Sequence, residues 1–173
     1  MILSSTVLLL VVVLVAFYYD IRFNIIPNKL IIIGLPLGLI NSVLVAGIEG
    51  LITSVLGFLI SGGIMMILYI FKALAAGDVK LFAVIGAIMG LEFVLYCMMY
   101  TILIGGLLAI IILVVTRTFL SRMLVAIQHI WTSFIFKSTE PLKTFKATKA
   151  TTMPFMVAVL PGALITLYYM YVA

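Results

Sequence analysis

Apolar runs of nearly bilayer length constrain this chain more than any other feature of its sequence. A helix needs about 20 apolar residues to cross the hydrocarbon core, with a range of roughly 17 to 25. Hydrophobic residues make up 66% of the 173 residues and charged residues only 9%, too few to coat a soluble globule. We predict an all-α polytopic membrane protein, a single domain over residues 1–173 with about six transmembrane helices. The candidate spans are about Ile2 to Tyr19, Leu30 to Ala46, Leu51 to Phe71, Val79 to Leu91, Phe93 to Thr116 and Thr152 to Val172.

The fourth run is short, because Leu81 to Leu91 between Lys80 and Glu92 would rise only about 16 Å at 1.5 Å per residue. Either this helix begins before Asp78 or Glu92 is submerged. We favour the earlier start, which carries Asp78 below the headgroups, where neighbouring helices and entering water can solvate it.

The basic residues predict the orientation of the chain. The side opposite to them has Glu49 and Glu92 and no Lys or Arg. Because cytoplasmic loops are rich in Lys and Arg, we place the basic segments in the cytoplasm and both termini outside. This topology explains the net charge of +5 without a nucleic-acid partner, with membrane lipids as the anionic surface. The ten basic residues are Arg22, Lys29, Lys72, Lys80, Arg117, Arg122, Lys137, Lys143, Lys146 and Lys149.

Two aspartates carry the chemistry that the sequence suggests. Asp20 closes the first span and Asp78 opens the fourth, so the two spans between them return both carboxylates to the cytoplasmic face. Taken singly, Asp20 fits a helix-end charge beside Arg22, and Asp78 fits an acid favoured by a helix dipole. Together they can meet, and two carboxylates suffice for peptide hydrolysis when one accepts a proton from water and the other donates one.

The residues that follow Asp20 predict a rigid turn. Pro27 restrains Ile26 to an extended conformation, and Asn28 can cap the helix that begins near Leu30. We therefore expect a short loop that holds Asp20 over the bundle.

Gly77 gives the backbone before Asp78 a freedom that permits close approach of a helix or of substrate main chain. Lys80 lies roughly 200° around the helix from Asp78, so we expect it to act as an anchor at the membrane interface rather than to pair with that carboxylate.

These motifs, in this order, resemble the short type IV prepilin peptidases of the Tad/Cpa type, which are membrane aspartyl proteases with a GxGD motif. The resemblance rests on Asp20-x-Arg22, Ile26-Pro27-Asn28, Ala76-Gly77-Asp78-Val79-Lys80-Leu81 and Met153-Pro154-Phe155. It implies cleavage of the basic leader of Flp-like prepilins at the cytoplasmic face of a bacterial membrane. Asp20 and Asp78 would be the catalytic pair. The residues that bind substrate or shape the site would be Gly77, Arg22, Ile26, Pro27, Asn28 and Lys80. One departure is that Ala75 replaces the first glycine of the motif.

No metal or cofactor is expected, because Cys97 and His129 are the only cysteine and histidine. Larger members of the family carry paired CxxC motifs and methylate the new N-terminus, so the resemblance is to the peptidase-only branch.

The segment of about 117–151 has apolar residues on one helical arc. This pattern predicts an interfacial cytoplasmic helix that anchors the bundle or guides substrate, followed by a polar linker.

Two other functions remain open. A proton- or cation-coupled transporter would use the same carboxylates but expects charge near the midplane and matching broken helices. A pilus-assembly scaffold would tolerate Asp→Asn at either site.

Overall fold

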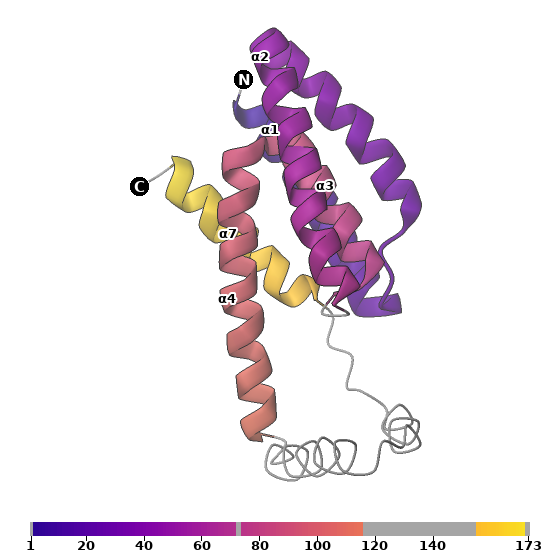
Figure 1. The fold of residues 1–173 in the computed structure, drawn as a ribbon, viewed down its shortest axis with the longest axis vertical. Helices are drawn as coiled ribbons and strands as arrows, with labels where there is room; N and C mark the ends of the chain where they lie inside the picture. Colours follow the sequence, from indigo (N-terminus) through magenta and orange to yellow (C-terminus); the bar gives the residue numbers. More distant parts are fainter. Residues whose placement is uncertain (1, 72–73, 116–154, 172–173) are drawn as a thin grey trace, which may run out of the picture. The chain divides into compact units, whose positions relative to one another are not determined.

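A computed structural model describes residues 2–71, 74–115 and 155–171, and every regular element in these ranges is an α-helix (Figure 1). The all-α prediction is therefore confirmed. The helices are α1 (Ile2–Phe23), α2 (Asn28–Ile70), α3 (Ala76–Met89), α4 (Leu91–Val115) and α7 (Met156–Tyr171).

Three helices are long and apolar enough to cross a membrane, namely α1, α2 and α4, whereas α7 is apolar but shorter. The chain divides into two compact units, Met1–Gly105 with Pro154–Ala173 and Gly106–Met153. Everything described below lies in the first unit. In the second unit, the described residues are the end of α4 up to Val115. The predicted interfacial helix over about 117–151 lies outside the described residues.

Helix α2 is two arms joined by a sharp reversal, which Figure 1 shows near its label. The break is at Ala46 (φ −135°, ψ 16°) and Gly47 (φ 60°, ψ −137°). The positive φ at Gly47 is a conformation that glycine adopts without steric cost. The arms, residues 28–45 and 48–70, correspond to the second and third predicted spans.

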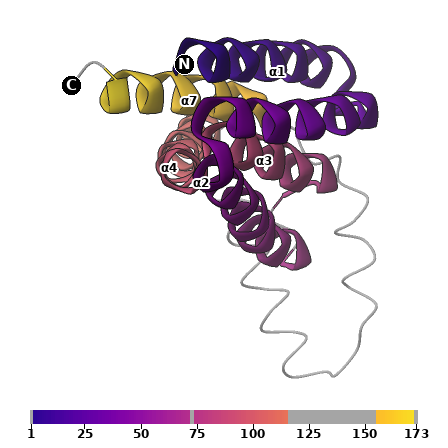
Figure 2. The same ribbon diagram turned by 90° about the horizontal axis from the view of Figure 1, so that it is seen from above.

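Helix α3 is the core of the first unit, since nine of its 14 residues are buried. It packs against both arms of α2, and Figure 2 shows it between them. Gly57 of the second arm meets Gly86 so closely that a methyl group on either glycine would clash with the opposite backbone. Ser61 of the same arm donates to the carbonyl oxygen of Phe82 at 3.0 Å. Small residues and hydroxyl donors of this kind join helices that have no hydrophobic driving force between them in lipid.

The ends of two helices differ from the predicted spans. Helix α3 begins at Ala76, so the earlier start before Asp78 is confirmed, and it ends at Met89 because Gly90 (φ 85°) separates it from α4. Helix α1 runs four residues past Tyr19 and ends where Asn24 takes a left-handed conformation (φ 51°). Asn is one of the few residues that tolerate this conformation. Asp20 therefore lies inside the last turns of a helix rather than at its end.

Candidate active site

The carboxyl group of Asp20 is buried at the junction of α1 and α7. The residue is 8% exposed. Its Oδ2 accepts a hydrogen bond from the backbone N–H of Met156, the first residue of α7, at 2.9 Å. A residue of the first helix is thus held by the main chain of the last described helix.

Asp78 is buried at the beginning of α3 and is 6% exposed. Its Oδ2 accepts a hydrogen bond from the backbone N–H of Ala75 at 3.1 Å, and its own N–H donates to the carbonyl oxygen of Ala75 at 3.1 Å. Ala75 precedes the helix and Asp78 is its third residue, so the carboxylate caps a donor that has no partner within the helix.

The two carboxyl groups lie within electrostatic reach of each other. Asp78 is in the first turn of α3, outside the three helices long enough to cross a membrane. Burial raises its pKa to about 6, against the lowering effect of the Ala75 hydrogen bond, and the negative charge of Asp20 raises it further. A raised pKa keeps a carboxyl group protonated closer to neutral pH, as a proton donor requires.

Gly77 contacts the turn between α1 and α2. A Cβ atom at Gly77 would lie 3.3 Å from Cβ of Ile26. Gly77 is helical, however, and is not among the described residues with positive φ, so its special backbone freedom is not used. The nearest neighbour of Gly77 is thus the side chain of Ile26 in the turn, and the predicted approach of a helix or of substrate main chain stays a prediction.

The predicted cap at Asn28 is wrong. Pro27, with φ −68° and ψ 130°, occupies the cap position before α2 and makes no side-chain cap hydrogen bond. The fixed φ of proline suits this extended position, and it leaves Asn28 as the first helical residue. The amide oxygen of Asn28 instead accepts a hydrogen bond from Nζ of Lys80 at 2.9 Å. Lys80 thus ties the start of α3 to the start of α2, while its predicted role as an anchor at the membrane interface stays a prediction.

Arg22 makes its contacts within α1. Its guanidinium donates to the hydroxyl of Tyr18 at 3.2 Å and lies 5.8 Å from the ring centre of Phe23. The structure therefore places Arg22 on the exposed surface of the helix that carries Asp20.

The family of the chain follows from comparison with known proteins. The profile of the type IV leader peptidase family matches residues 7–110, which include both aspartates and the turn between them. The chain belongs to the type IV leader peptidase family. It is 35% identical over 91 residues to a prepilin leader peptidase/N-methyltransferase of Bacillus subtilis (strain 168). That match covers 51% of this chain and 36% of the relative, so the chain spans about a third of the length of that protein. No solved structure matches.

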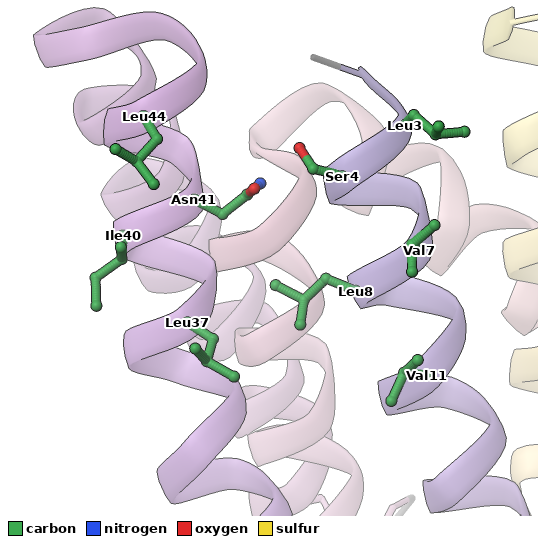
Figure 3. Close-up of a pocket in the computed structure, with 9 residues that line it drawn as sticks. All are labelled: Leu3, Ser4, Val7, Leu8, Val11, Leu37, Ile40, Asn41 and Leu44. Carbon is green, nitrogen blue, oxygen red and sulfur yellow. The ribbon is translucent and has the colours of Figure 1, made fainter.

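Two large grooves of this leader peptidase family member lie away from the aspartates. One, of about 760 Å³, is an apolar trough between α1 and the first arm of α2 (Figure 3). The other, of about 710 Å³, lies between the two arms of α2 and α3, with Lys80 and Asn28 among its lining residues. Neither groove is lined by Asp20 or Asp78.

The contact that sequence reasoning missed is the one between Asp20 and α7. The motif Met153-Pro154-Phe155 marked the start of the last helix, and its first two residues lie outside the described ranges. Phe155 is described, and its ring lies 6.3 Å from that of Phe82 in α3.

In the described part of the chain, no three His, Cys, Asp or Glu side chains lie together as a metal site would require.

Proposed function

We propose that this member of the type IV leader peptidase family is an aspartic endopeptidase that removes the basic leader of pilin-like precursors. We further propose that it is of the short, Tad/Cpa type and acts on Flp-like prepilins. The observation that carries the proposal is the pairing of two buried carboxyl groups, Asp20 and Asp78, each held by a backbone N–H.

This pair supports hydrolysis by an activated water molecule. The ionised carboxylate takes a proton from water as the water oxygen attacks the scissile carbonyl carbon, while the protonated carboxyl donates its proton to the carbonyl oxygen. The tetrahedral intermediate then collapses, the C–N bond breaks, and the leaving nitrogen takes up a proton from the dyad. The raised pKa of Asp78 favours Asp78 as the initial donor.

The site would face the cytoplasm. Asp20 lies near the end of α1 and Asp78 in the first turn of α3, close in sequence to basic residues at these helix ends. They are Arg22 in α1, Lys29 in α2 and Lys80 in α3. Cytoplasmic Lys and Arg are the usual topology signal of bacterial membrane proteins. A basic leader that remains in the cytoplasm would present its junction with the apolar helix of the precursor at this level.

The position of the aspartates argues against the transporter alternative. A coupling site is expected near the midplane of the bilayer, formed by broken helices in matching halves. Asp20 instead lies in the last turns of α1 and Asp78 in the first turn of α3, and the break that we find in α2 is at Gly47, remote in sequence from either of them.

The test is cleavage of a co-expressed precursor that has a basic leader, a glycine at the cleavage site and a hydrophobic helix. Asp20→Asn and Asp78→Asn should each abolish cleavage, because each carboxyl group has a separate proton-transfer role. Glu92→Gln is the matched control, since it neutralises an exposed acid in the first turn of α4. Immunoblots of membrane fractions should show equal amounts of all variants. Full cleavage by either aspartate variant would refute the aspartyl mechanism.

A further inference from the structure

We infer, building on the proposed function, that the first turn of α7 belongs to the active site, where the backbone N–H of Met156 positions Asp20 for catalysis. The family profile ends at residue 110, so α7 lies outside the part of the chain that it matches. Met156 is therefore a positioning residue that no comparison assigns.

The first observation is the hydrogen bond itself. The first four N–H groups of a helix have no partner within the helix, and Met156 is the first residue of α7. Its N–H donates to Oδ2 of Asp20 at 2.9 Å, across 136 residues of sequence. Met156 is 0% exposed and Asp20 is 8% exposed, so bulk water has little access to this bond. The positive end of the helix dipole also favours a carboxylate at this position.

The second observation is that the same turn contacts the helix of the other aspartate. The ring of Phe155 packs at 6.3 Å from that of Phe82, which lies one helical turn after Asp78 on the same face of α3. The carbonyl oxygen of Phe155 accepts hydrogen bonds from the N–H groups of Ala158 (2.9 Å) and Val159 (3.3 Å). The start of α7 is thus held in helical geometry while it touches both helices that carry the dyad.

These contacts matter because catalysis depends on where the carboxylate oxygens lie. An aspartate side chain has two rotatable bonds, and the Met156 N–H fixes Oδ2 by direct contact. A misplacement of about 1 Å in a catalytic group can reduce the rate on the order of 100-fold. We therefore expect loss of this donor to lower the rate of the chemical step without weakening substrate binding.

The donor can be removed without breaking the helix. Proline lacks an N–H, and the first helical position is where proline is best tolerated. Met156→Pro therefore deletes the group that bonds Asp20 and keeps the helix-compatible φ. Met156→Ala is the matched control, since it also removes the buried side chain but retains the N–H.

The experiment measures kcat and KM for cleavage of a pilin-like precursor by the full chain in detergent. We expect Met156→Pro to lower kcat on the order of 10- to 100-fold relative to Met156→Ala, with KM within about twofold. Equal kcat values for the two variants would overturn the inference. An inactive wild-type protein would instead refute the proposed function, so the two failures are distinguishable.

A second measurement needs no peptidase activity. Thermal unfolding of the wild type, Met156→Pro, Asp20→Ala and the double variant forms a double-mutant cycle. We expect Met156→Pro to lower the melting temperature by a smaller amount in the Asp20→Ala background, where the hydrogen bond is already absent. Equal shifts in both backgrounds would show that the amide and the carboxylate are not coupled, and would overturn the inference.

Discussion

Replacing Gly77 tests how closely the start of α3 approaches the turn after α1. A Cβ atom there would lie 3.3 Å from Cβ, 3.5 Å from Cγ1 and 3.6 Å from Cδ1 of Ile26. Carbon atoms pack best at about 3.5 to 4.0 Å, so Gly77→Ala requires a shift of a few tenths of an ångström. The higher helix propensity of alanine offsets that strain by up to about 1 kcal/mol. Gly77→Val adds two further carbons beside Ile26, and overpacking of this kind typically costs about 1–3 kcal/mol.

The consequence for activity follows from the next residue, because Asp78 moves with Gly77. We expect a mild loss of precursor cleavage for Gly77→Ala and a loss on the order of 10- to 100-fold for Gly77→Val. Adding Ile26→Ala to Gly77→Val removes the crowding Cγ1 and Cδ1 atoms and should recover part of the rate. Ala75→Gly is the control one step outside the helix. Ala75 has φ −85° and ψ 155°, an extended conformation that any residue adopts. The site therefore does not require glycine at this position, and Ala75→Gly should be tolerated.

The assay is cleavage of purified precursor in detergent, with size-exclusion chromatography to show that each variant is folded. A folded Gly77→Val protein that cleaves at the wild-type rate would refute the close-approach argument, even if both aspartates proved essential.

Two further predictions concern topology and pH. Cysteine replacing the exposed Glu49 should react with a membrane-impermeant maleimide in intact cells, whereas cysteine replacing the exposed Lys29 should react only after the cells are opened. The native Cys97 is buried and should not react. The reverse pattern of labelling would overturn the predicted orientation. The pKa of Asp78 is raised to about 6, so its contribution to folding stability is present below its ordinary value of 3.8 and is lost as pH rises through about 6. The melting temperature of Asp78→Asn relative to wild type should therefore increase between pH 4 and pH 8, and a difference independent of pH would contradict the burial of this carboxyl group.

Features set by local sequence were predictable. The lengths of the apolar runs located α1, the arms of α2, and α4, and the short fourth run indicated that α3 starts before Asp78. The predicted cap at Asn28 was wrong because Pro27, whose fixed φ suits the extended cap position, occupies that position instead.

Contacts between distant segments were not predictable. The hydrogen bond from Met156 to Asp20 joins residues 136 positions apart, and neither residue type indicates it in the sequence. In lipid, helix faces that contact other helices are about as apolar as those that contact acyl chains, so periodicity does not reveal which faces meet. The pairing of Gly57 with Gly86 is a similar case, because small residues are frequent throughout membrane helices.

The hydrogen bond between α1 and α7 also has a consequence for the order in which this protein is made. The ribosome delivers Asp20 early and Asp78 some time later, while the amide of Met156 emerges only with the last described helix. A nascent chain already inserted through α4 would hold both carboxyl groups but lack the donor that fixes one of them. Full proteolytic competence would then arise only once α7 has entered the bundle.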